Sequence, residues 1–176
     1  MSAAASIDFR PFVKDVPDFP KKGVVFKDIT PLLSDPKAFR AAIEAMAAPF
    51  KSRGITLVAG VESRGFLFAS SIAGALDAGV LLIRKKGKLP RKTLSVSYDL
   101  EYGVDTLELH ADAAGRGDNV LLADDVLATG GTAKASCELI EKLGAKVAGA
   151  AFLIELGFLK GRQKLSGREV RAVLRY

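Results

Sequence analysis

Residues 120–132 read Val-Leu-Leu-Ala-Asp-Asp-Val-Leu-Ala-Thr-Gly-Gly-Thr, and this stretch guides the interpretation of the whole chain. Its apolar start, together with Asn119, predicts a buried strand over residues 119–123, and helical spacing follows from about Thr132 to Leu143. The polar residues between them therefore form a loop at the carboxyl end of a strand. Ligands bind at that edge in open α/β sheets, so the loop is the first candidate for a functional site.

Two adjacent carboxylates, Asp124 and Asp125, end the predicted strand. Neighbouring carboxylates repel each other, so an ordinary turn gains little from having both. The pair becomes useful where it accepts hydrogen bonds from two neighbouring hydroxyls, as a ribose 2′,3′-diol offers, and where positive charge lies close by. We therefore expect a sugar at this position.

The residues that follow the carboxylates predict a phosphate site. Consecutive backbone N–H groups at a helix N-terminus bind anions, glycines allow close approach and positive φ, and threonines add hydroxyl donors. A nucleoside-triphosphate loop is disfavoured because the pattern Gly-x-x-x-x-Gly-Lys-Ser/Thr is missing. A dinucleotide fold is disfavoured because Gly115-Arg-Gly117 precedes a strand instead of opening a helix. The candidate phosphate-binding residues are Ala128, Thr129, Gly130, Gly131 and Thr132.

Outside this stretch, predicted strands and helices alternate. Asp35 and Pro36 favour the start of a helix that Gly54 ends, whereas the proline-rich first 30 residues predict an irregular arm outside the core. The strands are apolar throughout and not on every second residue, which indicates a parallel sheet with both faces covered. The other expected elements are strands over 55–59, 79–84 and 146–154, a helix over 66–77, and hairpin arms over 93–98 and 104–109.

Length and composition narrow the class of protein. The chain has 176 residues, which fits one domain, and no apolar run longer than 147–154, so we expect no membrane span. No secretory leader is visible, which indicates the cytoplasm, and one cysteine with one histidine leaves no zinc cluster. The net charge of +6 comes from residues 84–92 and 160–175. Without interleaved aromatic residues or any tryptophan, it favours a small polyanion over nucleic acid.

The stretch 120–132 closely resembles the phosphoribosyl-pyrophosphate binding signature of the type I phosphoribosyltransferases. Four other segments resemble, in the same order, the adenine-specific members of that family, and the resemblance covers about residues 17–165. These segments are Gly23-Val-Val-Phe-Lys-Asp-Ile-Thr-Pro-Leu-Leu33, Glu62-Ser-Arg-Gly-Phe-Leu-Phe68, Arg84-Lys-Lys-Gly-Lys-Leu-Pro90 and Tyr98-Asp-Leu-Glu-Tyr-Gly103.

The resemblance implies an α/β fold, with a parallel twisted sheet flanked by helices, a small N-terminal hood and a flexible basic hairpin loop. Residues 1–176 would form one domain, in which 1–34 form the hood beside the base site and 35–160 form the core. The implied reaction is purine salvage, in which adenine and 5-phosphoribosyl 1-pyrophosphate give AMP and pyrophosphate. Mg²⁺ would be needed and would be held mainly by substrate and water, with no direct protein ligand. The implied assembly is a homodimer, with neither nucleic acid nor membrane as partner.

The resemblance also assigns roles in the sugar and pyrophosphate sites. Asp124 and Asp125 would bind the ribose hydroxyls, and residues 128–132 would bind the 5′-phosphate. A cis peptide is implied between Glu62 and Ser63. The residues implied for pyrophosphate are Glu62, Ser63 and Arg64, assisted by Arg84 and Lys88, whereas Lys85, Lys86, Arg91 and Lys92 are expected to be solvated loop charges.

The implied adenine site lies in the N-terminal segment. The main chain at Val25 and Lys27 would present an acceptor and a donor to the purine, Phe26 would stack on the ring, and Leu156 would close the other side. Glu101 would transfer the proton at the imidazole edge of adenine.

Two alternatives stay open at this point. The enzyme could act on hypoxanthine, guanine or xanthine, because only the N-terminal segment argues for adenine. A non-catalytic regulator that senses phosphoribosyl pyrophosphate could keep the same sugar-phosphate site, although such regulators usually carry a DNA-binding module for which 176 residues leave no room.

Overall fold

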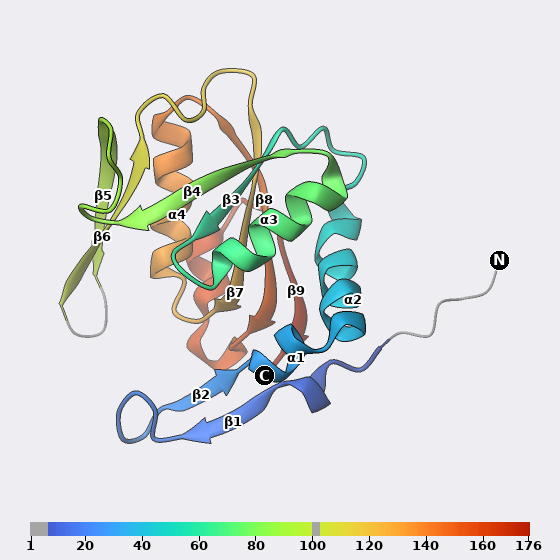
Figure 1. Ribbon diagram of the computed structural model, residues 1–176. Helices are drawn as coiled ribbons and strands as arrows, with labels where there is room; N and C mark the ends of the chain where they lie inside the picture. Colours follow the sequence, from blue (N-terminus) through green and yellow to red (C-terminus); the bar gives the residue numbers. More distant parts are fainter. Residues whose placement is uncertain (1–6, 100–102) are drawn as a thin grey trace.

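The computed structural model describes residues 7–99 and 103–176. Its centre is a seven-stranded sheet in the order β5-β6-β4-β3-β7-β8-β9 (Figure 1). Five of these strands are parallel neighbours, which confirms the predicted parallel sheet, and β5 and β6 form an antiparallel hairpin at one edge. The parallel strands are β3 (Leu57–Val61), β4 (Gly79–Lys85), β7 (Asn119–Leu127), β8 (Lys146–Glu155) and β9 (Val170–Arg175), and the hairpin strands are β5 (Thr93–Asp99) and β6 (Val104–His110).

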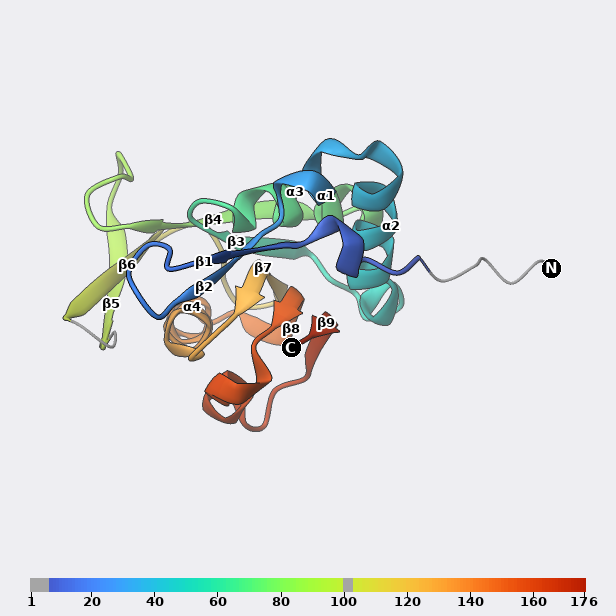
Figure 2. The ribbon, with the colours of Figure 1, turned by 90° about the horizontal axis from the view of Figure 1, so that it is seen from below.

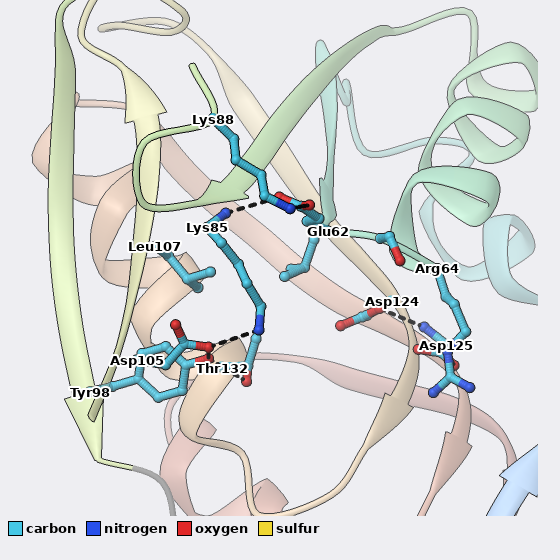
Figure 3. A pocket seen from close by; sticks show the side chains of 12 residues that line it. Glu62, Arg64, Lys85, Lys88, Tyr98, Asp105, Leu107, Asp124, Asp125 and Thr132 are labelled. Atoms are coloured by element: carbon cyan, nitrogen blue, oxygen red, sulfur yellow. Dashed lines mark hydrogen bonds and ion pairs between the residues drawn. The ribbon is translucent and has the colours of Figure 1, made fainter. Parts of the chain in front are cut away.

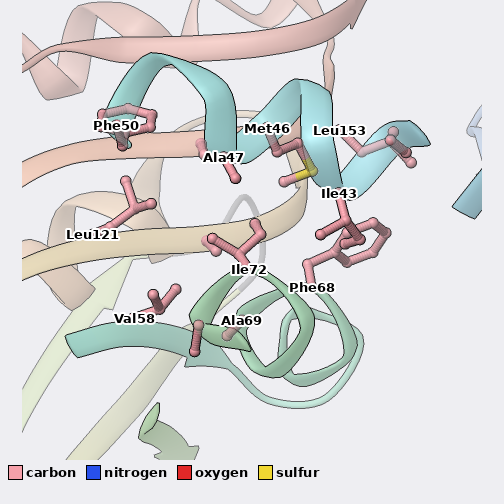
Figure 4. Packing of buried hydrophobic residues seen from close by; sticks show 14 of the residues in the cluster. Ile43, Met46, Ala47, Phe50, Val58, Phe68, Ala69, Ile72, Leu121 and Leu153 are labelled. Atoms are coloured by element: carbon pink, nitrogen blue, oxygen red, sulfur yellow. The ribbon is translucent and has the colours of Figure 1, made fainter. Parts of the chain in front are cut away.

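Helices cover both faces of the sheet. Figure 2 shows α2 (Pro36–Ala47) and α3 (Gly65–Leu76) on one side and α4 (Gly131–Lys142) on the other. Successive residues of a strand point to opposite faces, so Leu121 packs in the cluster under α2 and α3 while Leu122 packs in the cluster under α4. Both leucines are fully buried, and Figure 4 shows the first of these two clusters.

Local sequence signals place most elements within a few residues of their observed bounds. The side chain of Asp35 accepts the N–H groups of Lys37 and Ala38 and so caps α2, as predicted. The α-helix ends at Ala47, earlier than the predicted end at Gly54, and continues as the 3-10 helix η2 (Ala48–Phe50). Within the described ranges, no helix is long and apolar enough to span a membrane.

The prediction of an irregular N-terminal arm is wrong. The 3-10 helix η1 (Arg10–Phe12) is followed by β1 (Lys14–Pro17) and β2 (Val25–Asp28), which form an antiparallel hairpin. This hairpin lies within the implied hood of residues 1–34, and from here on the name hood refers to the hairpin alone. After the hood, α1 (Thr30–Ser34) leads into α2. Phe9 and Ile29, on either side of the hairpin, are buried in the core. Strands of four residues are too short to show a clear alternation, and Pro17 at the end of β1 with Pro20 between the strands hid the hairpin.

Two further features of the sheet differ from the sequence prediction. After η3 (Gly157–Leu159) and η4 (Gly161–Leu165), the unpredicted strand β9 pairs with β8, so the sheet continues beyond residue 160. The prediction that both faces of β4 are covered is also wrong. Leu81 and Ile83 are buried, but Val80 and Leu82 are each 44% exposed.

Candidate active site

A cavity of about 600 Å³ opens at the carboxyl ends of β3 and β7, beside the β5–β6 hairpin (Figure 3). It brings together side chains from segments far apart in the sequence, and seven of the twelve lining residues were predicted as site residues. The lining consists of Val61, Glu62, Ser63, Arg64, Lys85, Lys88, Tyr98, Asp105, Leu107, Asp124, Asp125 and Thr132.

The two aspartates lie within β7, near its carboxyl end, and not beyond it, since the strand runs to Leu127. The backbone N–H of Asp125 donates to Oδ1 of Asp124 at 2.9 Å. Burial raises the pKa of the Asp124 carboxyl, and the neighbouring charge of Asp125 raises it further. Hydroxyl donors or positive charge in the cavity would therefore stabilise this pair.

Arg64 supplies positive charge next to the acidic pair. Its Nε lies 2.7 Å from Oδ2 of Asp125, whose side chain is 7% exposed. The same Oδ2 has no hydrogen-bond partner among the described residues, so we treat this contact as an ion pair whose N–H is not aligned on the oxygen. The Arg64 side chain is 37% exposed, which leaves it accessible to an anion in the cavity.

Glu62 organises the cations on the opposite wall. Its Oε1 accepts from Lys88 Nζ at 2.5 Å, and its Oε2 accepts from Arg84 Nε at 3.3 Å and from the Lys85 N–H at 3.1 Å. The hydrogen bond from Lys88 is the largest cause that lowers the pKa of Glu62 to about 2. The Glu62–Ser63 peptide is cis, as the resemblance implies. Glu62 is thus ionised at neutral pH and holds Arg84 and Lys88 at this edge.

The loop between β7 and α4 forms a second, smaller hollow of about 80 Å³ beside the first. Gly130, which precedes α4, has φ +79, and a Cβ there would overlap the carbonyl oxygen of Gly161. Only glycine fits this position. Four of the five predicted phosphate-binding residues line the hollow, namely Ala128, Thr129, Gly130 and Thr132, and Gly131 is the first residue of α4.

The sequence analysis missed the contribution of the hairpin to the cavity. Thr132 Oγ1 donates to the Tyr98 hydroxyl at 3.1 Å, and that hydroxyl lies 3.4 Å from Oδ2 of Asp105. Lys85 Nζ lies 3.3 Å from the same oxygen, so Lys85, expected to be a solvated charge, lines the cavity. Tyr98 and Asp105 are register partners in the hairpin, and this pairing exists only once the hairpin has folded.

The hood approaches the cavity through Phe26. The Arg64 guanidinium lies 4.7 Å from the centre of the Phe26 ring, and Phe19 packs edge-on against that ring at 5.1 Å. Val25, next to Phe26, is 48% exposed.

Two other residues implied for the reaction lie outside the hood. Leu156 follows β8 and packs against the core. Glu101, the implied proton-transfer residue, lies outside the described residues.

The donor set of the cavity is limited for direct metal binding. Among residues 7–99 and 103–176, no group of three or more His, Cys, Asp or Glu side chains could hold a metal ion. The carboxylates that face the cavity are Asp124, Asp125, Glu62 and Asp105, and the last three are engaged by cationic side chains.

Comparison with known proteins assigns the family. The model of the phosphoribosyl transferase domain matches residues 28–171. The chain is 56% identical over 164 residues to an adenine phosphoribosyltransferase of Nitrosococcus oceani. The aligned residues cover 93% of this chain and 96% of the relative.

Two crystal structures of adenine phosphoribosyltransferases match the whole fold. The Rhodothermus marinus protein matches with a TM-score of 0.92 and 52% identity over 96% of each chain. The Saccharomyces cerevisiae protein, solved with D-2,5-dideoxy-2,5-imino-altritol 1,6-bisphosphate and adenine, matches with a TM-score of 0.89 and 39% identity over 94% of this chain and 96% of that chain. The chain described here therefore belongs to the phosphoribosyltransferase family and, within it, to the adenine phosphoribosyltransferases.

Proposed function

We propose that the protein transfers the phosphoribosyl group of 5-phosphoribosyl 1-pyrophosphate to adenine, which gives AMP and pyrophosphate in purine salvage. One observation carries the proposal: the acidic pair on β7 shares a cavity with the cations of the β3 and β4 ends, and the hollow of the phosphate-type loop that follows β7 lies beside this cavity. A phosphorylated sugar with a second anionic group is the ligand that satisfies both walls. The adenine and the bisphosphate bound by the yeast relative support this choice.

The sugar would bind at the end of β7. Asp124 and Asp125 would accept the two ribose hydroxyls, and the N–H groups and threonine hydroxyls of residues 128–132 would hold the 5′-phosphate. Positive charge develops on the ribosyl carbon during transfer, and carboxylates close to that carbon stabilise it. Because the loop and the aspartates are fixed by the same strand, they would orient the sugar for attack by the base.

The pyrophosphate would bind between Arg64 and the wall whose cations Glu62 organises. Arg64 would be the principal anion ligand, since its guanidinium is accessible and offers several N–H donors. Ser63, Arg84 and Lys88 would assist from the two neighbouring strand ends. Glu62 itself would position the cations and would not contact the leaving group.

The base would bind between the hood and the end of β8. The main chain at Val25 and Lys27 would read the 6-amino group and N1, Phe26 would stack on the purine, and Leu156 would close the other face. The Arg64 guanidinium occupies one side of the Phe26 ring, so this side chain connects the base and pyrophosphate sites. Glu101 would move the proton at the imidazole edge as a general base.

Mg²⁺ would bind together with phosphoribosyl pyrophosphate and not in a dedicated protein cage. The side chains of the cavity fit this mode, because Mg²⁺ keeps several waters and is commonly bound by one or two carboxylates plus substrate phosphates. The ion would offset charge on the leaving pyrophosphate. Asp124 and Asp125 are the carboxylates placed to accept from its water shell.

A homodimer in the cytoplasm is the proposed working form. Val80 and Leu82 leave an apolar strip on β4, and Leu67 on the adjacent α3 is 45% exposed. Apolar strips of this kind mark interfaces, and a second copy of the chain is the occupant that we propose.

The substrate supports the proposed cytoplasmic location, because charged, phosphorylated phosphoribosyl pyrophosphate does not cross membranes unaided.

The decisive assay measures AMP formed from adenine, phosphoribosyl pyrophosphate and Mg²⁺, with hypoxanthine in a parallel reaction. We expect AMP and pyrophosphate in equal amounts, a strong preference for adenine, and loss of activity when Mg²⁺ is chelated. A preference for hypoxanthine would contradict the adenine assignment. Binding of the donor without any transfer to a purine would instead identify a sensor.

A further inference from the structure

Tyr176, the residue after β9, is tied to both neighbours of Leu156. Its backbone N–H donates to the carbonyl oxygen of Glu155 at 3.0 Å, and its carbonyl oxygen accepts from the N–H of Gly157 at 2.8 Å. These two bonds hold the main chain of Tyr176 alongside the segment that contains Leu156. Both side chains pack against the same core cluster.

The ring of Tyr176 reaches in the other direction, to the hood. Lys27 Nζ lies 4.0 Å from the centre of this ring and 2.6 Å from Oδ1 of Asp15 on the neighbouring strand β1. The Lys27 side chain is only 10% exposed, whereas the Asp15 side chain is 57% exposed, so the ammonium group lies between an aromatic face and a carboxylate that is open to solvent. Cation–π contacts strengthen as the cation loses contact with water.

We propose that Tyr176 is a positioning residue for the purine, which fixes the spacing between the two walls of the base site. Its main chain holds the Leu156 wall and its ring holds the hood wall at Lys27. This inference rests on the proposed function, in which Val25, Phe26 and Lys27 face Leu156 across the base. The Lys27 side chain is committed to Tyr176 and Asp15, so its contribution to the base would come from the main chain.

Tyr176 lines neither the cavity with the acidic pair and the pyrophosphate cations nor the smaller hollow of the phosphate loop. Its loss should therefore weaken the binding of the purine and leave the binding of phosphoribosyl pyrophosphate unchanged. If Tyr176 served only to fill the core, its loss would lower thermal stability without weakening the binding of one substrate more than that of the other.

The test compares Tyr176→Leu with Tyr176→Phe in the full chain. Leucine keeps an apolar side chain but removes the π face, whereas phenylalanine keeps the face. We expect Tyr176→Leu to raise KM for adenine by about 3- to 30-fold, the range of a cation–π contact. For the same variant, kcat and KM for phosphoribosyl pyrophosphate should stay within about 2-fold, and Tyr176→Phe should restore KM for adenine.

A double-mutant cycle with Lys27→Met identifies the contact itself. The double variant Lys27→Met/Tyr176→Leu should raise KM for adenine no more than either single variant, because each removes the same interaction. Additive effects of the two substitutions, or an equal effect of leucine and phenylalanine at position 176, would overturn the inference.

A structural measurement separates this inference from the proposed function. Backbone hydrogen exchange over residues 25–28 should be faster in Tyr176→Leu than in Tyr176→Phe, whatever reaction the protein catalyses. Unchanged exchange would overturn the role of Tyr176 even in an active enzyme. Wild-type protein that forms no AMP would overturn the proposed function, while the exchange result still decides whether Tyr176 holds the hood.

Discussion

Gly161 lies in direct backbone contact with Ala128: a Cβ atom built on Gly161 would overlap the carbonyl oxygen of Ala128 and stand 2.9 Å from the backbone nitrogen of Gly130. The first residue of η4 therefore supports the loop proposed to bind the 5′-phosphate. The shape of that loop depends on a segment more than thirty residues further along the chain.

Substituting Gly161 by alanine should displace the phosphate loop. We expect KM for phosphoribosyl pyrophosphate to rise by roughly 10- to 100-fold, the cost of moving a binding group by about 1 Å. Steady-state kinetics measures the effect, with Gly115→Ala as control because no atom lies within 4 Å of a Cβ at that position. Equal KM values for phosphoribosyl pyrophosphate in the two variants would show that the phosphate loop does not need the support of Gly161.

Replacing both aspartates of the pair should impair binding of the sugar as well as transfer. In Asp124→Asn/Asp125→Asn we expect turnover to fall by about 10²- to 10³-fold, since the developing positive charge loses its stabilisation, and we expect weaker binding of the donor. The control is Asp112→Asn, an exposed carboxylate that does not line the cavity. Wild-type kinetics in the double variant would rule out the ribose assignment.

Glu101→Gln should slow chemistry and leave donor affinity nearly intact. A proton-transfer residue typically contributes about 10²- to 10⁴-fold, and the amide cannot take the proton. Single-turnover rates with adenine measure the chemical step, and calorimetry with phosphoribosyl pyrophosphate measures binding. If turnover is unchanged, Glu101 is not the proton-transfer residue.

The stabilising effect of Glu62 should disappear in acid. Its pKa is lowered from 4.5 to about 2 in the folded protein, so its contribution is complete above pH 4.5 and is lost as the pH falls toward 2. The shift corresponds to at most roughly 3 to 4 kcal/mol of unfolding free energy, and to less in practice because Lys88 and Arg84 are partly exposed. Urea unfolding should give a higher free energy of unfolding for the wild type than for Glu62→Gln at pH 7, and this difference should narrow below pH 4.5. A difference that does not change with pH would contradict this role.

The part of the site that lies on one continuous segment could be predicted from the sequence. The acidic pair, the glycine–threonine loop and α4 follow one another between residues 119 and 143, so local chemistry and strand–helix alternation were sufficient. The parallel sheet followed from strands that are apolar on every residue. The capping of α2 by Asp35 is equally local.

The parts that depend on long-range packing could not be predicted. Strand β9 and the support of Ala128 by Gly161 exist only once the chain has folded back on β8. Tyr98 enters the cavity through its contact with Thr132, thirty-four positions away in the sequence. The resemblance implied a hood, but the local pattern missed its hairpin because the strands have four residues each and Pro20 lies between them. Such pairings carry no local signal.

The most direct test is a crystal structure of the protein with AMP. We expect density for the 5′-phosphate within residues 128–132 and for both ribose hydroxyls at Asp124 and Asp125, with the purine between Phe26 and Leu156. Nucleotide density elsewhere on the molecule, or crystals that take up no AMP while calorimetry records no binding heat, would contradict the central claim that this acidic pair and its loop form a ribose-phosphate site.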